Sequence, residues 1–360
     1  MRTLLILLFA LPMALSAQPD GSPSPAGTPE ARAVLVIHGG AGTIRRDLLD
    51  VATEASIRAA LTAALEAGYA ELQHGAPALD AVITAITVLE DSPHFNAGRG
   101  AVFTADGYAE LDASIMNGAT GEAGAVSGVR HVKNPIVLAR EVMTNSSHVL
   151  LSGDGAEEFA LLRGVDLVPN QHFHTESRRD ALERVLQRQR EQQQSEQGAA
   201  NPGGVPERSV PEWQLEHPAP WQMTGTVGAV ALDQDGRLAA GTSTGGMTAK
   251  RYGRIGDSPI IGAGTFANES VGVSSTGHGE YFIRNVTAYD IAARMRYLSE
   301  SLPDAANTVI HETLTESGGT GGVIALGADG TVTMPFNTQG MYRGYINADG
   351  TVIVQLYSDE

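Results

Sequence analysis

Gly225-Thr226-Val227-Gly228-Ala229-Val230-Ala231-Leu232 begins where a long polar segment stops and a compact apolar region starts. The turn residues Asp233-Gln234-Asp235-Gly236 follow, and residues 237–246 read as a second short strand. Two short strands around a glycine-containing turn predict a β-hairpin. Thr226 is the first side chain of this region that can act as a nucleophile. Because Gly225 has no side chain, the Gly225–Thr226 peptide bond is sterically open to attack. We therefore expect the chain to cut itself at this bond.

This hypothesis gives Thr226 both halves of a hydrolytic site. A threonine hydroxyl is a poor nucleophile at neutral pH and needs an adjacent base. The free α-amine made by the cut has a reference pKa of about 7.7–8.0, so part of it is neutral at working pH. Before the cut the same nitrogen is an amide, which makes the precursor inactive. A lone threonine in a strand is more often an ordinary β-branched residue, so the hypothesis depends on the segments around it.

The composition limits the class of protein. The chain has 360 residues, of which 42% are hydrophobic and 18% charged, enough for one large domain or two ordinary ones. Abundant glycine (42 residues) and scarce aromatic residues (5%) suit a loop-rich α/β enzyme. A net charge of −17 with no basic block argues against a nucleic-acid partner. Cysteine is absent, which excludes disulfides, thiolate metal sites and a cysteine nucleophile.

The first 32 residues have the composition of a targeting segment. A charged start, an apolar run from Leu4 to Leu15 and the small pair Ser16-Ala17 predict a secretory signal peptide over residues 1–17, too short to span a bilayer. Residues 18–32 are rich in proline, glycine and serine and predict a disordered tether. No cysteine follows for a lipid anchor. We therefore expect a periplasmic or secreted protein with no membrane partner.

Residues 33–168 predict the first folded region. Val34 to Ile37 read as a buried strand that enters a glycine-rich turn at His38 to Gly42, and apolar spacing predicts amphipathic helices over 57–72 and from Pro77 to Leu89. The remaining expected elements are a loop at 95–100, a hairpin at 101–104 and 108–111, a strand at 149–151, and helices at 136–143 and 156–162.

Residues 169–225 change in character and predict a flexible linker that ends at the cleavage site. The segment is charged and Gln-rich, with a possible frayed helix over 178–196, and then rich in proline and glycine. A linker of this length inside a compact domain is unusual. It is explained if its far end becomes a free tail after the cut.

Residues 226–360 predict a second folded region. The expected elements are a strand at 271–275, a turn at 276–280 that opens a helix to about Leu298, a helix at 308–316, strands at 323–326 and 331–334, and a last hairpin at Asp349-Gly350. Strands thus cluster at the start of each half with helices outside. This order predicts helix–sheet–sheet–helix layers.

Several short motifs occur in a fixed order along both halves. They are His38-Gly39-Gly40-Ala41-Gly42, Phe95-Asn96-Ala97-Gly98, Asp112-Ala113-Ser114-Ile115-Met116, Gly225-Thr226-Val227-Gly228, Thr242-Ser243-Thr244-Gly245-Gly246, Gly253 to Pro259 and Thr276-Gly277-His278-Gly279-Glu280. In combination they resemble the isoaspartyl peptidase/plant-type L-asparaginase family of N-terminal nucleophile hydrolases. The resemblance covers about residues 34–162 and 225 almost to the C-terminus.

The resemblance implies an α+β fold, a four-layer αββα sandwich that is cleaved into α and β subunits. It implies a threonine amidohydrolase that acts on small L-aspartyl compounds, namely β-aspartyl dipeptides and L-asparagine, with no cofactor for its chemistry. It also implies a homodimer of cleaved αβ units.

The resemblance also assigns roles to individual residues. Thr226 would be the nucleophile of self-cleavage and catalysis, Thr244 would tune it, and Asn96 would support it. Arg254 would pair with the substrate α-carboxylate, for which its planar fork is suited. Asp257 would take the α-ammonium.

Two further groups follow from the same resemblance. The Thr276 hydroxyl and the Gly277 amide would form the oxyanion hole, with His278 and Gly279 beside the substrate. The loop from Leu89 to Arg99 would wrap a structural sodium ion, mainly through backbone carbonyls. The expected sodium ligands are Leu89, Glu90, Ser92, Phe95, Ala97 and Arg99.

Two other classes of protein stay open at this point. Gly241-Thr242-Ser243-Thr244-Gly245 fits the G-x-S-x-G pattern, so a secreted serine esterase with Ser243 as nucleophile is conceivable, although the polar, glycine-bearing sequence that follows is a poor nucleophile helix. A non-catalytic secreted binding module is the second. Within the favoured class, the balance between dipeptides and free asparagine is open, because Arg254 and Asp257 would hold only the aspartyl part that both share.

Overall fold

The computed structural model describes residues 34–199 and 225–360, so the predicted signal peptide, the tether and the second part of the predicted linker lie outside the described residues. Two β-sheets form its centre. The large sheet has the strand order β12-β11-β1-β5-β6-β2-β3-β4, and the small sheet has the order β10-β9-β8-β7. All paired strands are antiparallel except β3 and β4.

The strands of the large sheet are β1 (Val34–Gly42), β2 (Leu111–Asn117), β3 (Ala123–Val129), β4 (Leu150–Ser152), β5 (Val227–Leu232), β6 (Leu238–Thr244), β11 (Gly340–Ile346) and β12 (Val352–Tyr357). Those of the small sheet are β7 (Thr265–Ala267), β8 (Val271–Gly277), β9 (Gly321–Gly327) and β10 (Val332–Thr333). The expected hairpin is β5–β6, whose register runs from Val227↔Ser243 to Leu232↔Leu238.

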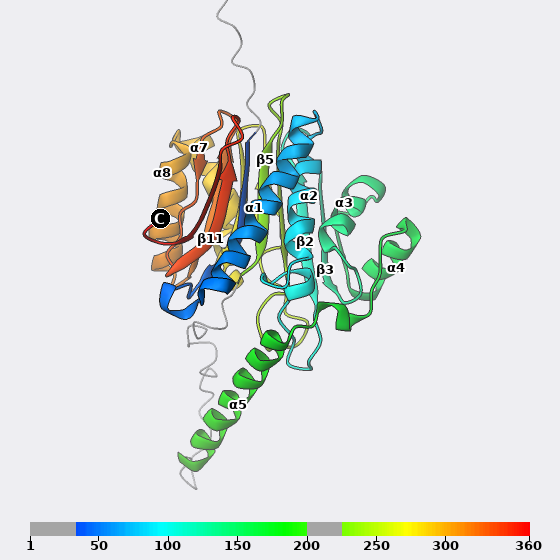
Figure 1. Cartoon of the computed structure of the whole chain (residues 1–360), viewed down its shortest axis with the longest axis vertical. Coiled ribbons are helices and arrows are strands. Elements are labelled where there is room, and N and C mark those ends of the chain that lie inside the picture. Colours follow the sequence, from blue (N-terminus) through cyan, green and yellow to red (C-terminus); the bar gives the residue numbers. More distant parts are fainter. Residues whose placement is uncertain (1–33, 200–224) are drawn as a thin grey trace, which may run out of the picture. The chain divides into compact units, whose positions relative to one another are not determined.

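Helices cover the outer face of each sheet (Figure 1). The large sheet carries α1 (Val51–Gln73), α2 (Ala78–Glu90), α3 (Pro135–Asn145) and α4 (Gly153–Arg163), and the small sheet carries α6 (Gly279–Asn285), α7 (Thr287–Leu298), α8 (Leu302–Asn307) and the π-helix η6 (Thr308–Leu314). Short 3₁₀ turns are η1 (Arg46–Leu48), η2 (Gly98–Gly100) and η3 (Asn170–Phe173). None of the helices within these described residues is both long and apolar enough to cross a membrane.

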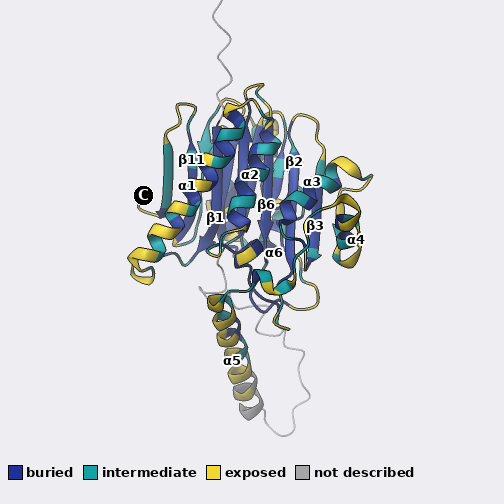
Figure 2. Cartoon of the chain, turned by 45° about the vertical axis from the view of Figure 1, so that its right-hand side comes forward, coloured by how far each residue is buried: buried dark blue, intermediate teal, exposed yellow. Residues whose placement is uncertain are grey.

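Side-chain alternation along the central strands builds the layers. In β1, Leu35 and Ile37 pack with the helices of the large sheet, whereas Val34 and Val36 pack with side chains of the small sheet. Successive strand residues point to opposite faces, so each central strand contributes to two cores. Figure 2 shows these strands buried between helices. The predicted four-layer αββα sandwich is confirmed.

Several elements differ from their predicted bounds, and two of them differ in continuity as well. The glycine-rich segment at His38 to Gly42 was expected to be a turn, but β1 continues through it because β11 pairs with it, with an irregularity in register between His38 and Gly40. The helix expected from the 276–280 turn to Leu298 is two helices, because Val286 adopts a left-handed conformation (φ 49°) between α6 and α7.

The structure also differs from the predicted linker over its first part. Phe173 of η3 is fully buried, and Leu182 and Val185 of α5 (Glu176–Ala199) pack with the helix-side core of the large sheet. Leu182 and Val185 lie three positions apart, so they share one face of α5 in a segment that is otherwise charged and Gln-rich. Figure 2 shows most of the other described side chains of α5 as exposed.

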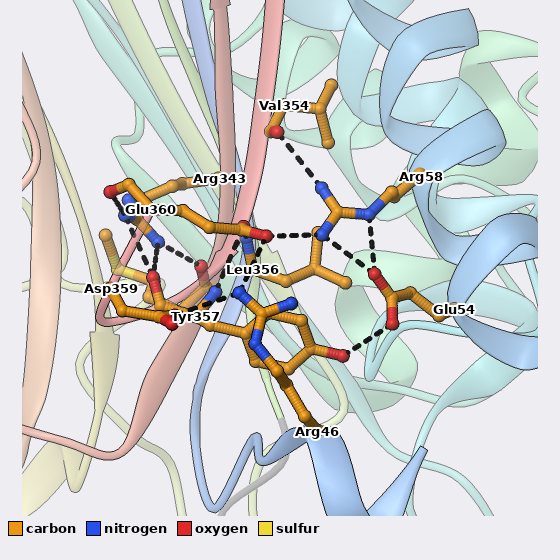
Figure 3. A network of polar contacts seen from close by, with 10 residues as sticks. Arg46, Glu54, Arg58, Arg343, Val354, Leu356, Tyr357, Asp359 and Glu360 are labelled. Atoms are coloured by element: carbon orange, nitrogen blue, oxygen red, sulfur yellow. Dashed lines mark hydrogen bonds and ion pairs between the residues drawn. The ribbon is translucent and has the colours of Figure 1, made fainter. Parts of the chain in front are cut away.

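A polar network fastens the C-terminus to α1 (Figure 3). Arg58 of α1 pairs with Glu54 one turn away and with Glu360 at the chain end, at 2.8 and 2.7 Å. The Tyr357 hydroxyl donates to Glu54 at 2.8 Å, and Arg343 of β11 donates to the carbonyls of Tyr357 and Glu360. The network therefore holds β12 and β11 against α1, and β11 is the neighbour of β1.

Candidate active site

The two ends of the β5–β6 hairpin bring the predicted nucleophile and its partner together. Thr226 precedes β5 and Thr244 ends β6, and both side chains are buried, with 8% and 3% exposure. The Thr226 hydroxyl donates a hydrogen bond to the Thr244 hydroxyl at 3.1 Å. The Thr244 oxygen also accepts from the main-chain N–H of Gly246 at 3.0 Å, which fixes its position.

Asn96 clamps the turn that follows Thr244. Its carbonyl accepts from Gly245 N–H at 3.0 Å, and its side-chain amide donates to the Gly246 carbonyl at 2.7 Å. Its side-chain oxygen accepts from Val102 N–H at 2.9 Å. These hydrogen bonds join Asn96 to the turn that follows Thr244.

The Gly225–Thr226 peptide lies against the end of β1. Gly225 has φ +69°, and a Cβ atom there would lie 2.5 Å from the Gly39 carbonyl oxygen and 2.9 Å from Gly40 Cα. Gly40 has φ +114°, and a Cβ on it would lie 2.0 Å from Gly225 Cα. Only glycine on both sides permits this approach.

His38 holds Thr226 from the other side. Its Nδ1 lies 3.0 Å from the Thr226 carbonyl oxygen and its Nε2 lies 2.9 Å from the Ser274 hydroxyl of β8. Burial lowers the pKa of His38 to about 3, so the ring is neutral. Because a carbonyl can only accept, Nδ1 carries the proton and Nε2 accepts from Ser274.

This tautomer sets the direction of a chain of buried hydroxyl groups between the sheets. Oxygen–oxygen distances are 2.8 Å for Ser114–Thr265, 2.6 Å for Thr265–Thr242 and 2.7 Å for Thr242–Ser274. Each hydroxyl can donate to the next and the last to His38. Hydrogen bonds aligned in one direction in a dry interior strengthen one another. The chain therefore connects β2, β7, β6 and β8 to the carbonyl of Thr226.

The predicted oxyanion residues lie where β8 ends beside β1. Thr276 is 1% exposed, and its hydroxyl accepts from Ala41 N–H at 3.4 Å. Gly277 has φ +146°, and a Cβ there would lie 2.4 Å from the Thr320 carbonyl oxygen. Thr276 therefore neighbours the same end of β1 that contacts Gly225, whereas Gly277 packs against Gly321 at the start of β9.

The predicted substrate-binding pair converges on the start of α6. A Cβ on Gly279 would lie 2.8 Å from Asp257 Oδ1 and 2.9 Å from Arg254 Nη2. Arg254 makes a bidentate pair with Glu280, at 2.9 and 2.8 Å. The Glu280 carboxylate also lies 3.3 Å from His278 Nε2.

The surroundings of Asp257 and Arg254 shift the pKa values of both side chains. Burial raises the pKa of Asp257 to about 7 against the attraction of Arg254, and Asp257 Oδ2 has no hydrogen-bond partner among the described residues. Burial lowers the pKa of Arg254, but the hydrogen bonds and charge of Glu280 outweigh it and leave a net rise. A buried carboxylate oxygen without a partner beside a fixed guanidinium suits a ligand that carries both an ammonium and a carboxylate.

Comparison with known proteins agrees with this geometry. Residues 31–355 match the sequence profile of the family described as asparaginase. The chain belongs to the asparaginase family. It is a family of N-terminal nucleophile hydrolases, in keeping with the four-layer fold.

Similar members come from several kingdoms. The chain is 47% identical to the isoaspartyl peptidase of Escherichia coli strain K12, over 91% of this chain and 97% of that protein. It is 40% identical to a probable isoaspartyl peptidase/L-asparaginase 2 of Arabidopsis thaliana, over 90% and 98%. It is 42% identical to a plant-type L-asparaginase of Pyrococcus abyssi, over 87% and 95%.

The alternative nucleophile Ser243 has a structural role in this asparaginase-family fold. It is fully buried within β6, and its hydroxyl donates to Glu90 Oε1 at 2.6 Å. The same oxygen accepts from Ile136 N–H, and burial raises the pKa of Glu90 to about 8. A nucleophile elbow needs an exposed serine between a strand and a helix, so a serine esterase is not supported.

The loop expected to hold sodium turns its carbonyl groups toward its own glycines. A Cβ on Gly98 would lie 2.3 Å from the Glu90 carbonyl oxygen, and one on Gly100 would lie 2.1 Å from that of Phe95 and 2.8 Å from that of Pro93. Carbonyl oxygens are the donors that hard cations prefer. No group of three His, Cys, Asp or Glu side chains within residues 34–199 and 225–360 is arranged to bind a metal. The loop therefore offers donors of the type that the resemblance implies for sodium.

Three residues at the site were not predicted to have these roles. His38 and Glu280 lie inside motifs that were singled out, but nothing in the sequence indicates which atoms they contact. Arg178 lies in the predicted linker, where its charge is one of many. The structure places it at a pocket shared with Gly225 and Asn96, with its Nε donating to the Gly100 carbonyl at 2.8 Å.

Proposed function

We propose that the protein is a self-cleaving threonine hydrolase of β-aspartyl dipeptides and L-asparagine, which releases L-aspartate together with an amino acid or ammonia. The observation that carries the proposal is the Thr226–Thr244 hydroxyl pair, directly after a glycine pressed against β1. The names of its relatives, isoaspartyl peptidase and L-asparaginase, support the substrate class.

In self-cleavage, the Thr226 hydroxyl attacks the carbonyl carbon of Gly225. The bond to the Thr226 nitrogen breaks as the bond to its oxygen forms, and the nitrogen leaves as an amine. Water then hydrolyses the ester, which gives a Gly225 carboxylate and a free Thr226 hydroxyl. His38 holds the Thr226 carbonyl, so the residue keeps its place after the chain is cut.

In turnover, the Thr226 α-amine takes the proton of the hydroxyl as the oxygen attacks the substrate β-carbonyl. Arg254 and Asp257 would hold the α-carboxylate and α-ammonium of the aspartyl group. The Thr276 hydroxyl and the Gly277 amide would stabilise the oxyanion. The α-ammonium returns the proton to the leaving nitrogen, and water releases aspartate from the ester.

Denaturing electrophoresis with N-terminal sequencing tests this proposal. We expect two fragments, the smaller beginning at Thr226, and activity only in cleaved protein. Thr226→Ala should stay intact and inactive. Thr226→Ser keeps a hydroxyl and should retain part of the self-cleavage and part of the hydrolytic activity. An intact chain that hydrolyses a β-aspartyl dipeptide would refute the mechanism.

We also propose a structural sodium ion in the loop from Leu89 to Arg99, with the donors predicted above and no part in the chemistry. The loop carbonyls support this proposal. Sodium would fix the end of α2 and, through it, the position of Asn96. Replacing sodium with N-methylglucamine should lower the unfolding temperature, and an unchanged temperature would contradict it.

The signal-like composition of residues 1–17 supports a proposal of export to the periplasm or medium, which cell fractionation would test. The family resemblance supports a homodimer of cleaved αβ units. Light scattering of the cleaved protein would distinguish that assembly from a single αβ unit.

A further inference from the structure

A pocket lies on the side of Thr226 from which the chain arrives. Its lining includes Gly39 and Gly40 of β1, Asn96, Arg178, Gly225 and Tyr342. Tyr342 of β11 pairs in register with Gly40. No acidic side chain of the described residues lines this pocket, and Arg178 is the one arginine or lysine among them that does.

The proposed chemistry locates the leaving group at this pocket. The Thr226 nitrogen must lie within hydrogen-bond reach of the nitrogen that leaves, because it returns the proton to it. In the uncut chain that same nitrogen is bonded to Gly225. A leaving group in contact with the amine therefore occupies the space that Gly225 holds before cleavage, and Gly225 is part of the pocket wall.

Arg178 is held at this wall by packing and by hydrogen bonding. It lies in the first turn of α5, which Leu182 and Val185 fasten to the core. Its Nε donates to the Gly100 carbonyl at 2.8 Å, which orients the guanidinium. Burial lowers the pKa of Arg178 to about 10, which leaves the group charged at neutral pH. A partly buried cation favours an anion at its side.

We propose that this pocket is a carboxylate subsite on the leaving-group side, in which Arg178 binds the α-carboxylate of the amino acid released from a β-aspartyl dipeptide. The inference rests on the proposed function and refines its substrate class. The leaving group of L-asparagine is ammonia, which has no carboxylate to bind at this site. Arg178 is therefore a specificity residue that favours dipeptides over asparagine.

The chain itself supplies a second carboxylate that Arg178 could bind. Self-cleavage turns the Gly225 carbonyl into a carboxylate beside the same pocket. If Arg178 served only this new chain end, it would affect every substrate equally, since each of them must wait for the same tail to leave. The two sources therefore predict different patterns across substrates.

The test compares three substrates on one cleaved preparation: a β-aspartyl dipeptide such as β-aspartyl-leucine, the same dipeptide with its terminal carboxylate as an amide, and L-asparagine. Arg178→Met should lower kcat/KM for the free-acid dipeptide by roughly 10- to 100-fold, the range of a charge-assisted hydrogen bond. It should change kcat/KM for the other two by less than about threefold. The ratio within one preparation does not depend on how much protein is active.

Two further variants control the result. Arg184→Met removes a charge from an exposed position of the same helix and should leave the ratio unchanged. Arg178→Lys keeps a charge and should retain part of the preference for the free acid. If Arg178→Met leaves the ratio of kcat/KM between the free-acid dipeptide and the other two substrates unchanged, the proposed subsite is refuted. If it does so while lowering all three activities equally, Arg178 is assigned instead to the Gly225 carboxylate. An unmutated protein inactive on all three substrates would instead refute the proposed function.

Discussion

Replacing Gly225 with alanine should slow self-cleavage without harming the finished enzyme. A residue other than glycine in the left-handed region costs about 1–2 kcal/mol. The added methyl would also lie 2.9 Å from Gly40 Cα and 2.5 Å from the Gly39 carbonyl oxygen. Carbon atoms pack at roughly 3.5–4.0 Å, so the Gly225 backbone must move away from β1 by at least about 0.6 Å.

A displacement of this size takes the scissile carbonyl away from the Thr226 hydroxyl. Misplacing reacting atoms by about 1 Å can cost about 100-fold in rate, so we expect cleavage to slow by roughly 10- to 100-fold. The measurement is a time course of chain cleavage by denaturing electrophoresis, started from protein made by cell-free translation. Activity per cleaved chain should match the unmutated protein, because the sequence from Thr226 onward is unchanged.

Gly236 provides the matched control. It also has a positive φ, +76°, but a Cβ there has no atom within 4 Å. Gly236→Ala therefore carries the same backbone cost without the contact and should cleave at the normal rate. If Gly225→Ala cleaves as fast as Gly236→Ala, the close approach of β1 does not position the scissile bond and the reasoning fails.

Three further predictions concern the site. Thr244→Val removes the acceptor of the Thr226 hydroxyl and should lower kcat of fully cleaved protein by roughly 10- to 100-fold, with little change in KM; a kcat within twofold of normal would contradict this. The pKa of Asp257 is about 7 in the folded chain against an ordinary value of 3.8, so the folded state binds more protons between these values. The free energy of unfolding should therefore fall as pH rises across this window, at up to about 1.4 kcal/mol per unit. Asp257→Asn should remove that slope in urea titrations. Exchange of sodium for N-methylglucamine should lower the unfolding temperature by a few degrees, and Gly107→Ala, at an open turn, should not alter that difference.

The elements of the fold that depend on local pattern could be predicted from the sequence. The β5–β6 hairpin follows from a glycine turn between apolar runs, and α1 and α2 follow from apolar residues at helical spacing. The continuation of β1 through His38–Gly42 could not, because it depends on pairing with β11, which is 300 positions away in the register of Ala41 with Met341. A pattern read along the chain carries no information about such a partner.

The site could be predicted only in part for the same reason. Thr226 could be singled out from its own chemistry, whereas the roles expected of Arg254 and Asp257 came only from the family resemblance. The pairing of Arg254 with Glu280 depends on α6 folding back onto the loop that carries Arg254. Arg178 gave no signal, because a cation in a Gln-rich helix looks solvated until Leu182 and Val185 of α5 dock it at the pocket.

The buried hydroxyl chain explains how residues from distant segments keep a common geometry. It begins at Ser114, whose hydroxyl also lies 2.6 Å from the carbonyl oxygen of Ser258, the neighbour of Asp257. It ends at His38, which holds the carbonyl of Thr226. The segment that would bind the aspartyl ammonium and the residue that would attack its β-carbonyl are thus linked by one line of buried polar contacts, in which the single Ser114 hydroxyl proton serves either Thr265 or Ser258. Because each donor in a dry interior is costly to leave unpaired, neither end can shift without breaking the line. The distance between the proposed nucleophile and the proposed substrate anchor is therefore a property of the packed sheets, and we expect it to survive a cut beside Thr226.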